Sequence, residues 1–186
     1  MKVLKKIAIV LFTLTILCAC APKEKEASPT EVLDAYLKQI ITSQVGDSLG
    51  QAKTETEGKL YQKIADLMGK VTYTLDNEQV KDDKATVDGH FKVYDMATSY
   101  NEMINRLVAE VSNDAENKNE EEINERVYTF WLEELEKIEE RGADLDFHYS
   151  FELAKGENGW NVDDVSSDRT FLDGMMGGLI STIEGY

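Results

Sequence analysis

The chain has 186 residues, 42% of them hydrophobic, which is enough for one globular domain with its own core. Its 36 acidic and 20 basic residues give a formal net charge of −16. Nucleic-acid binding depends on lysine and arginine contacts to phosphate, and no basic patch follows residue 20. The composition therefore excludes a nucleic-acid-binding protein and, with 12 glycines and two prolines, a fibrous or low-complexity one.

The first 19 residues have the pattern of a cleaved signal peptide. Lys2, Lys5 and Lys6 precede the uncharged run IAIVLFTLTIL. A helix of that length measures about 16 Å at ~1.5 Å per residue, which is too short for the ~30 Å core of a bilayer. A basic start followed by a short apolar stretch is typical of a secretory signal rather than of a stable membrane span.

The end of this run resembles the lipobox of bacterial lipoproteins. Leu17, Cys18, Ala19 and Cys20 match its order of leucine, a tolerated residue, a small residue and a cysteine. The resemblance implies that a diacylglyceryl group joins the Cys20 sulfur and that the signal is cut between Ala19 and Cys20. Cys18 does not fit as the modified residue, because the large Leu17 stands directly before it.

Lipidation at Cys20 has consequences for the mature chain. Cys20 becomes its only cysteine and a thioether, so no disulfide within the chain is expected. Residues 1–19 carry three lysines and no acid, so their removal takes the net charge from −16 to −19. We expect the protein at the cell membrane, facing outside the cytoplasm, with its anionic body standing off the anionic lipid surface.

Residues 20–27 form a short charged stretch that we interpret as a tether to a single domain over residues 28–186. Ser28 and Pro29 are typical of a helix start. Apolar residues at helical spacing then predict a first helix that Gly46 and Gly50 end, and a second helix over residues 57–69.

Alternating apolar residues predict two hairpins. The first has strands over residues 71–75 and 85–93 around a turn at 76–83, and Gly89 on its apolar face indicates a bend or bulge. The second covers residues 145–153 and 160–162.

Residues 97–141 between the hairpins form a helical insertion, either one long helix or the antiparallel pair that we favour. Ser167 or Asp168 caps a last helix that ends near residue 183. This order predicts an α+β fold in which helices pack on a curved antiparallel sheet of about four strands.

The body of the chain resembles the cystatin-like, nuclear-transport-factor-2-like superfamily, in particular lipoproteins of Gram-positive bacteria that carry such a domain. The segments behind this resemblance are SPTEVLDAYLKQI, DDKATVDGHFKVYD and FELAKGENGWNVDD, within residues 28–173. The resemblance implies a cone-shaped domain with a pocket between sheet and helices, and no settled activity. Candidate pocket residues are Tyr73, Phe91, Tyr149 and Trp160.

Two histidines are the candidate metal ligands. His90 and His148 alternate with apolar residues, so both are expected on the outer, polar face of the sheet. Together with Asp88, Asp146 or Glu152 they could hold zinc. Two solvated strand residues explain the same pattern, and the sequence contains neither HExxH nor a spaced Cys/His cluster, so no metal or other cofactor is predicted.

The inward strand positions are almost all apolar, and Tyr73 and Tyr149 are their polar exceptions. They contain no acid–base pair for catalysis. The acidic runs NDAENKNEEE and DDVSSD lack the ligand spacing of a calcium loop. We therefore expect a non-catalytic domain that binds a small ligand or an envelope protein. The alternatives are an isomerase- or dehydratase-like enzyme that uses the cone pocket, and a structural subunit of an envelope assembly.

Overall fold

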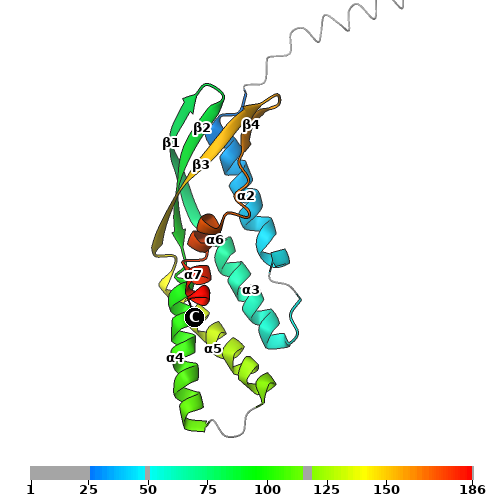
Figure 1. Cartoon of the computed structure of the whole chain (residues 1–186), viewed down its shortest axis with the longest axis vertical. Coiled ribbons are helices and arrows are strands. Elements are labelled where there is room, and N and C mark those ends of the chain that lie inside the picture. Colours follow the sequence, from blue (N-terminus) through cyan, green and yellow to red (C-terminus); the bar gives the residue numbers. More distant parts are fainter. Residues whose placement is uncertain (1–25, 49–50, 115–118, 186) are drawn as a thin grey trace, which may run out of the picture.

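The computed structural model describes residues 26–48, 51–114 and 119–185. Within them it has six helices and one antiparallel sheet, as the α+β prediction requires (Figure 1). None of the described helices is both long and apolar enough to cross a membrane. In chain order the elements are α2 (Pro29–Ser48), α3 (Glu55–Gly69), β1 (Thr72–Lys81), β2 (Lys84–Val93), α4 (Met96–Asp114), α5 (Glu120–Arg141), β3 (Leu145–Gly156), β4 (Gly159–Val162), α6 (Arg169–Met175) and α7 (Leu179–Glu184).

The four strands lie in the order β1-β2-β3-β4, with every neighbouring pair antiparallel. The two predicted hairpins are therefore confirmed, and β2 pairs with β3 to join them. The long β2–β3 pairing runs without a break from Lys84↔Ala154 to Val93↔Leu145. This regular register fixes which side chains share a row across the sheet.

The first hairpin turn is shorter than predicted. Strand β1 continues to Lys81, and only Asp82 and Asp83 make the turn, with Asp82 at φ 54°. The polar stretch that we expected to be a loop is instead an edge strand with a bulge between Asp76 and Gln79. Its central Asn77 has φ 51°, a conformation that asparagine tolerates better than most residues.

Gly89 is not the bulge that its place on the apolar face suggested. It pairs in regular register with Leu75 and with Tyr149. A Cβ atom here would lie 2.7 Å from Cε2 of Phe91 and 2.8 Å from Cε2 of Phe151. Gly89 is therefore needed because two aromatic rings fold over the backbone at this point.

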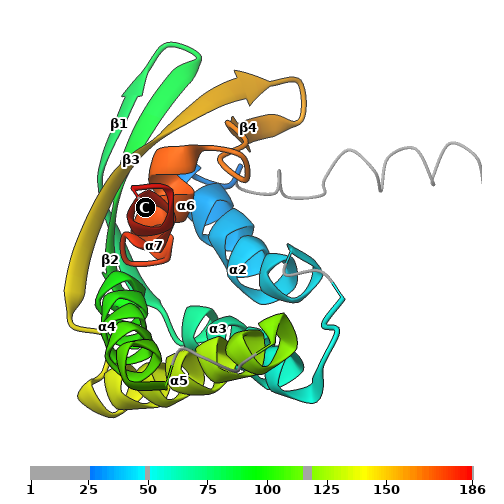
Figure 2. The ribbon, with the colours of Figure 1, turned by 60° about the horizontal axis from the view of Figure 1, so that its bottom comes forward.

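Helices α2 and α6 cover the inner face of the sheet, and among the described elements none covers its outer face (Figures 1 and 2). Residues of β2 alternate between buried and more exposed along its length, as such a half-covered sheet requires. We call the buried cluster on the inner face the sheet core: Leu33, Leu37, Val71, Ala85, Val87, Phe91, Val93, Phe151, Leu153, Val165, Phe171 and Met175.

Residues 97–141 form a helical pair rather than one long helix, so the favoured alternative is confirmed. Helix α4 runs away from the sheet and α5 returns alongside it and alongside α3 (Figure 1). With α7 these helices enclose a second cluster, the helical core: Leu60, Ile64, Leu67, Tyr94, Met96, Leu135, Ile138 and Leu179.

One predicted helix end is wrong, and another is met only in part. Helix α2 continues through Gly46 and ends at Ser48, two residues before Gly50, because one glycine weakens a helix by only about 1 kcal/mol and need not end it. The predicted last helix, which Asp168 does cap, is broken into α6 and α7 at Gly177 and Gly178. These glycines have φ 59° and 79°, which is the left-handed region that favours glycine.

Candidate functional site

The predicted lipid attachment site, which consists of Leu17, Cys18, Ala19 and Cys20, lies outside the described residues. Signal cleavage and lipidation at Cys20 therefore stay predictions. The described chain begins at Glu26, whose carboxylate pairs with Lys155 Nζ at 3.1 Å. The first described residues therefore lie beside the β3–β4 hairpin, and the far end of the α4–α5 pair lies at the opposite end of the molecule (Figure 1).

The four residues predicted to line a pocket all belong to the sheet core or pack against it. Phe91 is 1% exposed, and its ring lies 5.6 Å from that of Tyr73. The ring of Tyr149 lies 4.9 Å from that of Phe151 and is tilted against it, and Trp160 on the edge strand β4 lies beneath Lys155. Together with Phe147 and Phe171, these side chains place aromatic rings throughout the space between the sheet and α6.

The hydroxyl groups of the inner face are engaged in structural hydrogen bonds. Tyr73 donates to Asp34 Oδ1 at 2.9 Å, and Lys38 donates to the other Asp34 oxygen at 2.6 Å. Lys38 first, and then Tyr73, holds the pKa of Asp34 below its ordinary value. Burial and the Asp34 carboxylate raise the pKa of Tyr73 to about 12. At neutral pH Asp34 is thus ionised and Tyr73 protonated, so they tie α2 to β1 and do not exchange a proton.

A buried carboxylate, which the sequence analysis did not identify, lies at the start of α3. Glu57 accepts hydrogen bonds from Tyr61 Oη at 2.7 Å, Tyr128 Oη at 3.3 Å and the backbone N–H of Lys53 at 2.5 Å. The Lys53 N–H, followed by Tyr61, lowers the pKa of Glu57, and Glu57 raises that of Tyr61 to about 12. Every partner favours the ionised carboxylate, so the group stabilises the helix start and its contact with α5.

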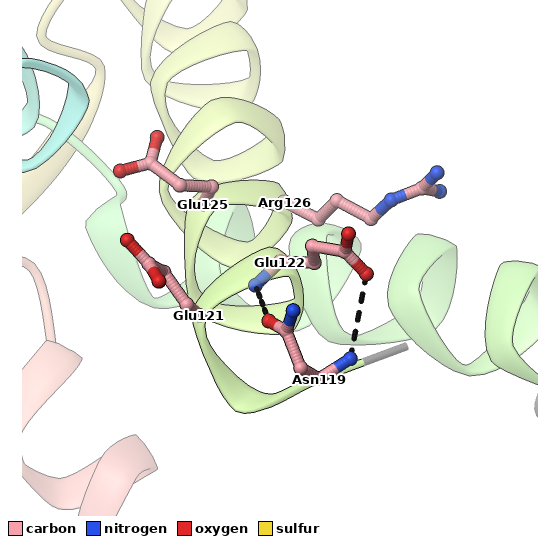
Figure 3. Close-up of a pocket in the computed structure, with 5 residues that line it drawn as sticks. All are labelled: Asn119, Glu121, Glu122, Glu125 and Arg126. Atoms are coloured by element: carbon pink, nitrogen blue, oxygen red, sulfur yellow. Dashed lines mark hydrogen bonds between the residues drawn. The ribbon is translucent and has the colours of Figure 1, made fainter. Parts of the chain in front are cut away.

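Close to Glu57, the start of α5 borders an open surface hollow of about 620 Å³ (Figure 3). Asn119 accepts from the Glu122 N–H at 2.9 Å, and the Asn119 N–H donates back to Glu122 Oε2 at 3.3 Å. This is a capping box, and it accounts for two of the polar residues at the rim. The others are Glu121, Glu125 and Arg126.

The two histidines face each other across the outer side of the sheet. His90 and His148 are direct partners in the β2–β3 register, and their Nδ1 atoms are 2.5 Å apart. The rings meet edge to face, with centroids separated by 4.5 Å. His90 Nε2 lies 3.0 Å from Asp76 Oδ1 on the neighbouring strand.

Three carboxylates surround this pair. Asp88 precedes His90 by two residues on the same face, and its pKa is lowered by the hydroxyl of Ser150, then by Asn77 and by the field of His90. Asp146 pairs with Lys92 at 2.7 Å, which lowers its pKa as well. The third is Asp76, which the sequence analysis placed in a turn and therefore did not connect with the histidines.

Within the residues that the structure describes, no three His, Cys, Asp or Glu side chains are already grouped closely enough to hold a metal ion. Of the carboxylates proposed as partners, Asp88 lies beside the pair and Asp146 is engaged by Lys92. Glu152 lies opposite Thr86, further along β3. The pair thus brings two imidazole nitrogens together but not a complete set of protein ligands.

Comparisons with known proteins give a distant structural similarity. No family model and no curated protein matches the sequence. A crystal structure of a "putative lipoprotein (ycdA)" from Bacillus subtilis is similar at 13% identity and a TM-score of 0.45. The match covers 81% of this chain and 47% of that one, so this chain spans about half the length of the Bacillus subtilis protein. A similarity at this level assigns neither a family nor an activity.

Proposed function

We propose that this chain is a lipoprotein, anchored by Cys20 to the outer face of the cell membrane, whose α+β domain acts by binding rather than by catalysis. The order Leu17, Cys18, Ala19, Cys20 directly after a short signal-like run is the observation that carries the proposal. The anchor leaves residues 20–27 as the link to the domain.

The geometry of the domain is compatible with such a link. An extended chain spans about 3.3 Å per residue, so the eight-residue link reaches roughly 25 Å. It meets the domain near Glu26 and the β3–β4 hairpin. The hairpin ends would then lie nearest the membrane, and the far end of the α4–α5 pair would point away from it, toward soluble partners.

The state of the described carboxyl groups supports a binding role. Wherever the pKa of a described Asp or Glu is shifted, it is lowered, as for Asp34, Glu57 and Glu139. A carboxyl group that acts as a general acid near neutral pH needs the opposite shift. Packed aromatic rings also cover the inner face of the sheet.

The anchor can be tested with the two neighbouring cysteines as matched variants. We expect Cys20→Ser to lose incorporation of a labelled fatty acid and to retain its uncleaved signal. Cys18→Ser should still be labelled and cleaved, because serine is tolerated at the second lipobox position. Equal labelling of Cys20→Ser and the unaltered chain would contradict the proposal, as would loss of labelling in Cys18→Ser alone.

A further inference from the structure

The geometry points to a site for a divalent transition-metal ion of the zinc class on the outer face of the sheet, with Nδ1 of His90 and Nδ1 of His148 as its two protein nitrogen ligands. The site lies on the opposite side of the sheet from the aromatic interior. It is independent of the proposed lipid anchor and of any partner of the domain.

The sheet itself brings the two ligands together. His90 and His148 occupy one row of an unbroken antiparallel pairing, which holds directly opposite side chains about 5 Å apart at Cβ. Both rings turn Nδ1 toward the other, so the two nitrogens converge at 2.5 Å. Ligands of a tetrahedral zinc ion at ~2.0–2.1 Å are about 3.3 Å apart, so each ring needs to turn by only a fraction of an ångström to admit the ion.

Asp76 orients His90 as a metal ligand. Its carboxylate accepts the Nε2–H of His90 at 3.0 Å, which leaves the lone pair of a neutral His90 on Nδ1, facing His148. A carboxylate on the far nitrogen of a ligating histidine is the usual outer-shell arrangement at metal sites. Asp76 is therefore a positioning residue that fixes the tautomer and the ring orientation.

Without metal, the same geometry makes His148 Nδ1–H the donor to His90 Nδ1. When the ion binds, both Nδ1 lone pairs form coordinate bonds to it, and the His148 proton moves from Nδ1 to Nε2 through solvent. Each imidazole stays neutral and no net proton is released. The hydrogen bond between the rings is thus replaced by two metal–nitrogen bonds.

There is room for the rest of the coordination shell. A hollow of about 240 Å³ lies over the pair and is bordered by Asp88 and Ser150. Water molecules can occupy the remaining positions of a tetrahedral ion there. Three carboxylates, those of Asp76, Asp88 and Asp146, lie around the pair, and Lys92 pairs with Asp146, so the local field favours a cation.

The ligand type selects the class of ion. Imidazole nitrogens suit zinc, copper and nickel, whereas calcium and magnesium require sets of oxygen ligands. The chain has only two histidines, so any imidazole-dependent binding can be attributed to this pair.

The test uses the full chain without a histidine tag and with Cys18→Ser and Cys20→Ser, so that no thiol competes for the metal. Titration with ZnCl2 is followed by calorimetry and by nitrogen-15 NMR of the two imidazoles. We expect one saturable site, with the Nδ1 resonances rather than Nε2 reporting coordination. Millimolar CaCl2 should not displace the zinc.

Variants separate ligands from positioning residues. Loss of an outer-shell carboxylate costs about 10–100-fold in metal affinity, so we expect about tenfold for Asp76→Asn and at least ~100-fold for His90→Gln or His148→Gln. Thr86→Gln, which is exposed on the same face of β2, is the control and should bind as the unaltered chain does.

Undiminished zinc binding in the His90→Gln/His148→Gln double variant would overturn the site, as would coordination through Nε2 or no saturable binding at all. Both substituted side chains point away from the cores, and circular dichroism checks that the variants fold. If a histidine variant does not fold, the NMR spectrum of the chain with both histidines still tests the site. Coordination through Nδ1 supports it, and coordination through Nε2 contradicts it. Success or failure here does not depend on lipidation, because Cys20 is absent from the tested chain.

Discussion

The sheet core and the helical core are neighbours that share Met68 at their boundary, but they are stabilised differently. The sheet core is held by apolar packing, with Phe91 at the centre of a set of rings that includes Phe151 and Phe171. The helices around the second core are joined by ion pairs, of which Lys63 and Lys70 to Glu139 connect α3 with α5.

Because of this difference, the two parts should respond differently to salt and to pH. Apolar burial contributes about 25 cal/mol per Å² and is insensitive to pH and to moderate salt. Ion pairs between partly exposed side chains weaken as salt screens them or as acid neutralises the carboxylates. We therefore expect the helical end of the molecule to loosen first when salt is raised or pH is lowered.

The largest expected effect comes from removing the central ring of the sheet core. Phe91→Ala should lower the free energy of unfolding by about 3–5 kcal/mol, because it deletes a fully buried aromatic side chain. The neighbouring Lys92→Ala, which points outward, should leave it nearly unchanged. Urea unfolding measures both, and equal losses would contradict the assignment of the two faces.

The junction between the cores depends on two adjacent glycines that differ in their surroundings. A Cβ atom at Gly177 would lie 2.1 Å from the Tyr94 carbonyl oxygen, whereas at Gly178 it would meet only Ala97 Cβ at 3.7 Å. Gly178→Ala should cost about 1–2 kcal/mol, the usual cost of a left-handed conformation, and Gly177→Ala clearly more. Thermal unfolding of the two variants compares them, and a larger loss for Gly178→Ala would show that the junction is packed differently.

Within the helical core, Arg106 joins α4 to α5. It pairs with Glu133 and with the buried Glu134, each at 2.7 Å, and its guanidinium lies 4.3 Å from the ring centroid of Phe130. Arg106→Met should cost about 1–2 kcal/mol, because the buried Glu134 then loses one of the two cationic partners that it has among the described residues and keeps Lys137.

Lys59→Met is the matched control for Arg106→Met, since Lys59 pairs with the exposed Glu55 within one helix. It should change the free energy of unfolding very little. The difference between the two variants should shrink at high salt. A difference that does not respond to salt would assign the Arg106 effect to packing of its side-chain stem.

The smallest effect is a pH dependence carried by Glu139. Hydrogen bonds from Lys63 and then Lys70 lower its pKa from 4.5 to about 2. Because the folded pKa is depressed, the stabilisation is present above about pH 4.5 and is lost as the pH falls toward 2. Glu139→Gln should flatten the fall in stability over this window. If the free energy of unfolding depends on pH identically in Glu139→Gln and in the unaltered chain, Glu139 does not carry this pH dependence.

Much of the sheet could be predicted from the sequence because most inward positions hold an apolar residue. Phe91, Phe151 and Leu153 alternate with polar neighbours, and a period of two leaves only one face for the core. The second half of β1, residues 77–81, could not be predicted in the same way. Both of its faces are exposed, so apolar and polar residues do not alternate along it. Misplacing that turn also concealed Asp76, since only the correct register brings it beside His90.

The break between α6 and α7 was hidden for a different reason. Apolar residues from Phe171 to Ile183 keep helical spacing, so the local pattern favours one helix. The turn after α6 needs a glycine at residue 177 because the backbone of Tyr94, more than 80 residues earlier in the chain, leaves no space for a side chain there. The contacts of Tyr128 with Glu57 and of Arg106 with Glu134 were likewise beyond reach, because each joins two separate helices.

The most direct test of the account is the mass of the N-terminal peptide of the protein purified from membranes of cells that express it. The account predicts a chain that begins at Cys20 and carries a diacylglyceryl group on that residue. A chain that retains residues 1–19, or one that begins at another residue without lipid, would contradict it.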